Sequence, residues 1–132
     1  MPDFDPRTLN KCAFEALQKL SDAQQSDKAR RKEQKNQAQE LYTYISTWGL
    51  MRLKAEEKVL DSQKGKQDVV ISFFRELQEL SNCEGLKDDE GIKTLISLSP
   101  NDYLGLTGLA IELANEFGFW ANAVYSDLKG AQ

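Results

Sequence analysis

The feature that most constrains the fold is a long stripe of large apolar residues near the C-terminus. Its members recur every three or four positions, the spacing of one face of an α-helix: Tyr103, Leu106, Ala110, Leu113, Phe117, Trp120 and Val124. Ser99 can cap this helix, Pro100 suits its first position, and Asp102 lies in the first turn near the positive end of the dipole. The sequence therefore predicts one helix from residue 100 to about residue 128.

Shorter stretches of the same periodicity cover most of the remaining chain, and only 8 Gly and 3 Pro interrupt its 132 residues. The expected helices span about residues 8–21, 27–48, 50–61, 66–82 and 89–98, with Thr8 and Asp27 as candidate caps. Gly49 is expected to bend the chain, Gly65 to break it within a loop at 62–66, and residues 82–91 to form a surface loop. We therefore predict an all-α protein. It is expected to be a single helical domain, 1–132, folded as a bundle of five or six helices with a long C-terminal helix.

Three glycines of the C-terminal segment, Gly105, Gly108 and Gly118, lie off the apolar stripe. In a helix interior each costs nearly ~1 kcal/mol relative to alanine. Close approach of another helix backbone would be one reason to retain them.

Residue types that carry catalysis are scarce. The chain has no histidine, which excludes Ser–His and Cys–His nucleophilic pairs and His-containing zinc sites. Cys12 and Cys83 stand alone, which is typical of small buried hydrophobes in a cytosolic protein; a disulfide or a reactive thiol is the less favoured interpretation. The acidic run Asp88, Asp89 and Glu90 is interpreted as a charged loop rather than a metal site. We therefore expect no catalytic residue, metal, cofactor or small-molecule substrate, with an enzyme that uses carboxylates alone as an alternative.

The N-terminal residues 1–7 are polar and acidic, unlike a signal peptide, and no apolar run approaches the roughly 18 residues of a membrane span. We therefore expect a cytoplasmic protein without membrane contact.

Positive charge is concentrated in the first half of the chain. Residues 1–66 hold 13 Lys and Arg against 10 Asp and Glu, a net charge of +3, whereas residues 67–132 hold 4 against 11, a net charge of −7. The basic positions Lys28, Arg31, Lys32 and Lys35 share one side of a helix, and such a stripe can contact phosphates without reading bases. Arg52 and Lys54 extend the positive region; a solvated helix face is the alternative interpretation.

Most aromatic residues fall at core spacing, but three lie nearer the edges of the stripes. Tyr42, Phe119 and Tyr125 are therefore predicted to anchor an interface, where large amphipathic rings contribute most.

Two segments carry a resemblance to a known family. Residues 98–128, LSPNDYLGLTGLAIELANEFGFWANAVYSDL, and residues 28–53, KARRKEQKNQAQELYTYISTWGLMRL, resemble the small helical subunit of type III CRISPR–Cas effector complexes, most closely that of the type III-B branch. The resemblance implies a non-catalytic role in antiviral defense, in which a few copies stack along the complex while other subunits cleave. It implies backbone subunits, neighbouring small subunits, guide RNA and target RNA as partners.

Onto this chain the resemblance carries an RNA-binding role for Lys28, Arg31, Lys32 and Lys35, with Arg52 and Lys54 as weaker candidates. RNA affinity in isolation is expected to be weak and steeply salt dependent. The alternative is a helical adaptor or scaffold that contacts proteins and no nucleic acid.

Overall fold

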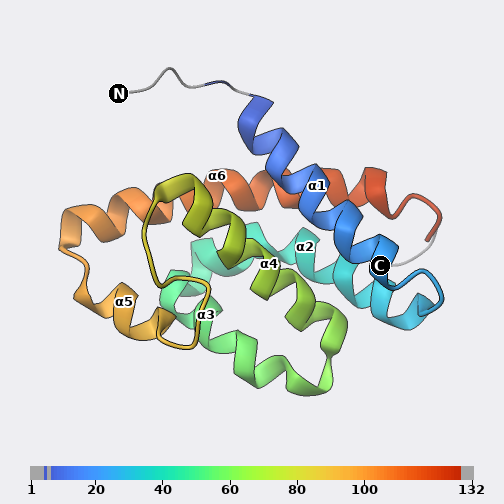
Figure 1. Ribbon diagram of the computed structural model, residues 1–132, viewed down its shortest axis with the longest axis horizontal. Helices are drawn as coiled ribbons and strands as arrows, with labels where there is room; N and C mark the ends of the chain where they lie inside the picture. Colours follow the sequence, from blue (N-terminus) through green and yellow to red (C-terminus); the bar gives the residue numbers. More distant parts are fainter. Residues whose placement is uncertain (1–4, 6, 129–132) are drawn as a thin grey trace.

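The computed structural model describes residue 5 and residues 7–128, and throughout these residues the protein is all-α (Figure 1). Six α-helices and one 3₁₀ turn follow one another as α1 (Arg7–Ala23), α2 (Lys28–Trp48), α3 (Leu50–Val59), η1 (Leu60–Ser62), α4 (Lys64–Ser81), α5 (Gly91–Ser97) and α6 (Pro100–Val124). The predicted all-α bundle with a long C-terminal helix is confirmed. The two ends of the predicted domain, residues 1–4 with 6 and residues 129–132, lie outside the described residues.

Local side-chain signals set several helix starts. The Ser99 hydroxyl accepts a 3.1 Å hydrogen bond from the Asp102 amide, and Pro100 occupies the first turn of α6, as predicted. Asp27 caps α2 by accepting from the Arg30 amide at 3.0 Å. The predicted cap at Thr8 is wrong, because α1 begins one residue earlier and the Asp5 carboxylate accepts from the Arg7 amide.

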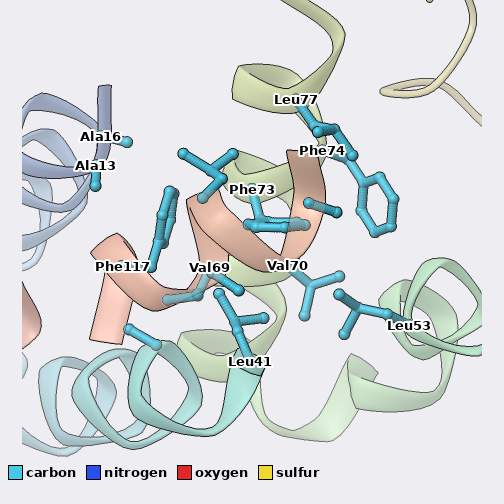
Figure 2. Packing of buried hydrophobic residues seen from close by; sticks show 14 of the residues in the cluster. Ala13, Ala16, Leu41, Leu53, Val69, Val70, Phe73, Phe74, Leu77 and Phe117 are labelled. Carbon is cyan, nitrogen blue, oxygen red and sulfur yellow. The ribbon is translucent and has the colours of Figure 1, made fainter. Parts of the chain in front are cut away.

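Helix α2 packs mainly against α6 and α4, and α1 crosses α6 (Figure 1). The centre of the core is Phe73 of α4, whose ring stands edge-on to Phe117 of α6 at 5.5 Å and to Phe74 at 5.6 Å between centroids (Figure 2). Each of these rings is fully buried, and burial of one such side chain contributes roughly 1.5–3 kcal/mol. Hydrophobic burial at the helical spacing read from the sequence therefore holds the bundle together.

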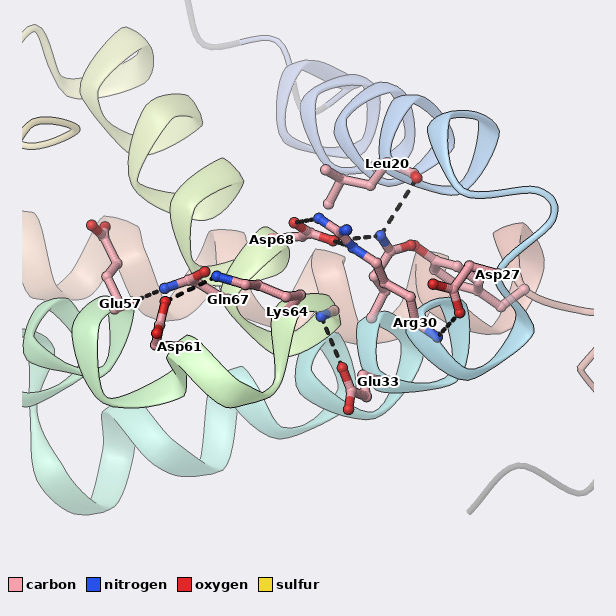
Figure 3. A network of polar contacts seen from close by, with 12 residues as sticks. Leu20, Asp27, Arg30, Glu33, Glu57, Asp61, Lys64, Gln67 and Asp68 are labelled. Atoms are coloured by element: carbon pink, nitrogen blue, oxygen red, sulfur yellow. Dashed lines mark hydrogen bonds and ion pairs between the residues drawn. The ribbon is translucent and has the colours of Figure 1, made fainter.

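Gly65 does not break the chain, so that prediction is wrong. It lies in the first turn of α4, where a Cβ atom would come within 2.2 Å of the Arg30 carbonyl oxygen of α2. Its amide donates a 2.8 Å hydrogen bond to Oε1 of Glu33 (Figure 3). The absence of a side chain therefore lets the start of α4 rest directly on the backbone of α2.

Gly49 bends the chain, as predicted. Its φ of +90° ends α2 and allows α3 to begin at the next residue, because this backbone conformation is disfavoured for residues with a Cβ.

The glycines of α6 do not share one explanation. In the described part of the chain, a Cβ at Gly105 or Gly108 would meet no atom within 4 Å, so none of the described helices approaches the backbone there. At Gly118 it would lie 3.7 Å from the Ala38 carbonyl oxygen of α2, an ordinary contact distance. Close helix approach therefore applies at Gly118 alone of the three.

Within the described residues, no helix combines the length and the apolar character that crossing a membrane requires.

Candidate nucleic-acid interface

Three lysines of α2 lie on one side of that helix. Lys28 and Lys32 are exposed and Lys35 is half-buried, and no ion pair engages any of them among the residues that the structure describes. They follow one another at four and three positions, which places them within one arc of the helix surface. These predicted phosphate-contacting residues are therefore brought together, with their charges facing solvent.

Arg31 is not part of this surface, which corrects its assignment as an RNA-binding residue. Its side chain is buried, and its Nη1 and Nη2 atoms lie 2.6 and 2.9 Å from the Asp127 carboxylate oxygens. Its Nε donates to Ser21 Oγ at 3.0 Å, and the guanidinium lies 5.5 Å from the centroid of the Tyr125 ring. The hydrogen bonds between Arg31 and Asp127 raise the pKa of Arg31 and lower that of Asp127. The guanidinium therefore binds the chain's own C-terminal turn.

The reason for this burial lies in the pattern of α2. Positions 31, 34, 38, 41 and 45, spaced three and four apart, form the stripe that faces the core. Four basic residues at i, i+3, i+4 and i+7 cover a wide arc, and Arg31 stands at the edge of that arc nearest the core. The neighbouring Arg30 is engaged as well, on the α4 side, by two 2.7 Å hydrogen bonds to Asp68 (Figure 3).

Lys54 is also buried, which corrects its assignment as an RNA-binding residue. Its Nζ lies 2.7 Å from Oε1 of Glu57 and 4.9 Å from the centroid of the Phe74 ring. Its methylene stem packs on Gly91, where a Cβ would come within 2.2 Å of Lys54 Cε. Burial raises the pKa of Glu57, and the ammonium of Lys54 opposes that shift. Lys54 therefore joins α3 to α4 and α5 rather than to a ligand.

Arg52 of α3 remains exposed but stands apart from the α2 lysines. Its guanidinium lies 4.8 Å from the centroid of the Trp48 ring, which is 55% exposed. Tyr44, Ala55 and Glu56 complete a shallow depression beside this pair. Arg52 is therefore a separate cation–aromatic site at the junction of α2 and α3.

Tyr125 is fully buried, so its assignment to an interface is wrong. Its hydroxyl donates a 2.6 Å hydrogen bond to Oε1 of Gln34, whose Nε2 donates to Asp68 at 2.9 Å. Burial raises the pKa of the Tyr125 hydroxyl well above its ordinary value. The residue secures the turn after α6 to the interior of the bundle.

Tyr42 and Phe119 are exposed, with 46% and 62% of their surfaces open to solvent. Both line one groove of about 420 Å³ where α2 meets α6. Its other lining residues are small or carry amides and a hydroxyl: Gln39, Thr43, Ala114, Asn115, Gly118 and Asn122. Gln39 Nε2 donates to Asn122 Oδ1 at 2.7 Å across the two helices. The sequence does not single out these amides, because no short-range signal indicates that residues 83 positions apart in the chain meet.

A second aromatic cluster adjoins Phe119. Its ring stands edge-on to Trp120 at 5.2 Å, and Trp120 stands edge-on to Phe14 of α1 at 5.5 Å. Trp120 Nε1 donates to Asn10 Oδ1, and Phe14 is 40% exposed. Apolar rings therefore continue from the groove across α6 toward α1.

Other chemistry in the described residues is limited. Within these residues, no three acidic or cysteine side chains converge as a metal site would require. Cys12 and Cys83 are free and half-buried, and burial raises the pKa of both thiols.

Comparison of the chain with protein-family models, curated proteins and solved structures gives no match.

Proposed function

We propose that this protein is a non-catalytic small subunit of a type III CRISPR–Cas effector complex that contacts the guide RNA–target RNA duplex through α2. The observation that carries the proposal is the set of three lysines on one open side of α2, Lys28, Lys32 and Lys35. The two arginines between them are bound to carboxylates of the same chain. On α2, the basic side chains left to meet an external polyanion are therefore the three lysines.

The geometry of this set suits a nucleic-acid backbone. Lys28 and Lys35 are seven residues apart, or about 10 Å along the helix axis at 1.5 Å per residue. Lysine ammonium groups act as point charges that neutralise phosphates without reading sequence. An RNA duplex is recognised mainly through its backbone and shape, which is what such a surface offers.

The overall charge argues for a role inside an assembly. The chain carries a net charge of −4, so three lysines alone give weak, salt-dependent affinity. Backbone subunits that already hold the guide RNA would supply the remaining contacts. The acidic second half of the chain suits basic surfaces of neighbouring subunits, giving specificity more than affinity.

The resemblance of residues 28–53 and 98–128 to the small subunit of type III complexes supplies the identity of that assembly. In the fold these segments are α2 with the start of α3, and α6 with its flanking residues. Helices α2 and α6 pack against each other, and the three lysines lie on α2.

The test is target-RNA capture by the complex assembled with Lys28→Glu, Lys32→Glu and Lys35→Glu together. A matched control carries Lys11→Glu, Lys19→Glu and Lys87→Glu, which change three exposed lysines elsewhere and alter net charge equally. Filter binding across a salt series should show weaker capture by the α2 variant, with the slope of log affinity against log salt shallower by about 2 to 3. Equal capture by the two variants would reject the RNA-contacting role.

A protein-only adaptor is the second candidate, and the exposed rings of Phe14 and Phe119, which stand on either side of the partly buried Trp120, favour it. Co-purification of the tagged protein separates the two candidates. Guide RNA and other effector subunits should accompany the protein under the first proposal. Protein partners without RNA would support the adaptor.

A further inference from the structure

We infer that the groove between α2 and α6 binds one unpaired nucleobase of the RNA, with Tyr42 and Phe119 as its aromatic walls. This inference rests on the proposed function and adds a site to it. The groove holds about 420 Å³, within the range of ~300–1,000 Å³ typical of small-ligand sites. Its floor includes Ala114 and Gly118, which leave room between the larger side chains.

The lining of the groove matches the chemistry of a base. None of the described residues that line it is acidic or basic, so it suits a neutral group. Exposed aromatic rings offer faces on which a base can stack. Gln39, Asn115 and Asn122 carry amides, which present donors and acceptors of the kind that pair with base edges.

The hydrogen bond between Gln39 and Asn122 leaves a specific pair of groups available. Gln39 Nε2 is the donor and Asn122 Oδ1 is the acceptor of that bond. Among the residues that the structure describes, the Gln39 carbonyl oxygen and the Asn122 amide nitrogen have no other partner, so one acceptor and one donor remain. Every nucleobase carries a donor or acceptor on its edge that such a pair can meet, so the site is expected to accept more than one base.

The position of the groove links it to the phosphate-contacting surface. Gln39 and Tyr42 follow Lys35 by one and two helical turns, on the same side of α2 as Lys28 and Lys32. A strand held by the lysines at its phosphates would therefore have a base within reach of the groove. The faces of bases inside an A-form helix are covered by stacking, so a base that stacks on the groove's aromatic rings is an unpaired one at a bulge or at a strand end.

The test compares two RNA duplexes that differ by one bulged uridine, using fluorescence anisotropy with the full chain at low salt. The wild-type protein should bind the bulged duplex at least about fivefold more tightly, the factor that one stacked base supplies at the low end of its range. Tyr42→Ala with Phe119→Ala should remove this preference and keep the affinity for the paired duplex. Trp48→Ala, which truncates an exposed ring outside the groove, should keep the preference.

The outcomes separate the two proposals. Equal wild-type affinity for both duplexes would overturn the base site and leave the lysine surface standing. Failure to bind either duplex, alone or in the assembled complex, would overturn both. Loss of complex assembly in the Tyr42→Ala and Phe119→Ala variant, with an unchanged bulge preference, would assign the groove to a protein partner instead.

Photocrosslinking locates the bound base directly and complements the affinity comparison of the two duplexes. A bulged 5-iodouridine couples on irradiation to an aromatic ring on which it stacks, and mass spectrometry locates the modified residue. Attachment at Tyr42 or Phe119 is expected, and attachment confined to other residues would overturn the base site.

Discussion

The hydroxyl of Tyr125 donates a 2.6 Å hydrogen bond to Oε1 of Gln34, and neither residue has any surface open to solvent. Gln34 in turn donates a hydrogen bond to Asp68, which also accepts two from the Arg30 guanidinium. The turn after α6 is thereby joined to α2 and α4 by side chains whose polar groups satisfy one another. Buried polar groups stabilise a fold only when they are paired, so loss of one member should be costly.

Removal of the Tyr125 hydroxyl tests this network. Tyr125→Phe keeps the ring but leaves the Gln34 carbonyl oxygen without its donor in the interior. The free energy of unfolding should fall by about 1–3 kcal/mol, the usual cost of an unsatisfied buried polar group. Urea denaturation followed by circular dichroism measures the change. Tyr42→Phe is the matched control, and it should change stability by less than about 0.5 kcal/mol because Tyr42 is exposed. Equal effects of the two substitutions would contradict the burial of Tyr125.

The free energy of unfolding at alkaline pH should depend on ionisation of the same Tyr125 hydroxyl. Burial raises the pKa of Tyr125 above its ordinary value of 10.0, so the unfolded chain ionises at lower pH than the folded one. The contribution of the neutral hydroxyl is complete below about pH 10 and is lost as pH rises further. Ionisation of Tyr125 should lower the free energy of unfolding by up to about 1.4 kcal/mol per pH unit above pH 10. Tyr125→Phe should lack that component, so the difference in stability between the two proteins should shrink between pH 9 and pH 11.

The helices can be predicted from the sequence because the signals that set them are local. Helical periodicity and caps such as Ser99 act within a few residues, and the helices they predict are present in the structure. The lysines of α2 were predictable for the same reason. The burial of Arg31 was not, because its partner Asp127 lies 96 positions away. One sequence signal did exist: Arg31 continues the spacing of Ala38, Leu41 and the other buried positions of α2.

The interior position of Tyr125 and the groove beside Tyr42 could not be predicted from the sequence for a similar reason. Both depend on where α6 rests against α2, which is set by the packing of the whole core. Apolar periodicity indicates which side of each helix is buried but gives no pairing between helices. The exposed position of Phe119 was predictable from its place off the stripe, whereas the amides next to it were not.

Glycines at two helical positions should respond oppositely to alanine. Gly108→Ala adds a Cβ in open space, so the helix propensity of alanine should stabilise the protein by roughly 0.8–1.0 kcal/mol. Gly65→Ala places a Cβ 2.2 Å from the Arg30 carbonyl oxygen, so α4 has to shift from α2. The free energy of unfolding of the Gly65→Ala variant should therefore fall by about 1–3 kcal/mol. Thermal denaturation measures both, and stabilisation by Gly65→Ala would disprove the close contact between α2 and α4.

The ion pair of Lys54 and Glu57 should behave as a structural element with its own pH dependence. Lys54→Met leaves the Glu57 carboxylate half-buried without its cation, so stability at pH 7 should fall by about 1–3 kcal/mol, less than for a fully buried pair. Burial already raises the pKa of Glu57, and removal of the ammonium raises it further.

A carboxyl group with a raised folded-state pKa stabilises the fold below its unfolded pKa, near 4.5, and loses that contribution as pH rises. The Lys54→Met protein should therefore be closest to wild type at about pH 4.5 and furthest from it at pH 7. Addition of Glu57→Gln should recover much of the loss at pH 7. Persistence of the full loss in the double variant would show that Lys54 acts through packing on Phe74 and Gly91 instead.

Arg31 and Lys32 are adjacent residues of equal charge on one helix, but Arg31 is buried and Lys32 is exposed. Arg31→Met removes the three hydrogen bonds of a buried guanidinium, two to Asp127 and one to Ser21, so stability should fall by about 1–3 kcal/mol. Lys32→Met removes an exposed charge and should change stability by less than about 0.5 kcal/mol.

Target-RNA capture by the two variants should show the reverse order when it is measured below the melting temperature of both. Lys32→Met should weaken capture and make its salt dependence shallower by about 0.7–0.9, the contribution of one phosphate contact. Arg31→Met should capture RNA as the wild type does, since its guanidinium faces Asp127. If Arg31→Met instead weakened capture while the melting temperature held, the guanidinium would have to leave Asp127 for the RNA, and the division of α2 into a structural edge and an open lysine side would fail.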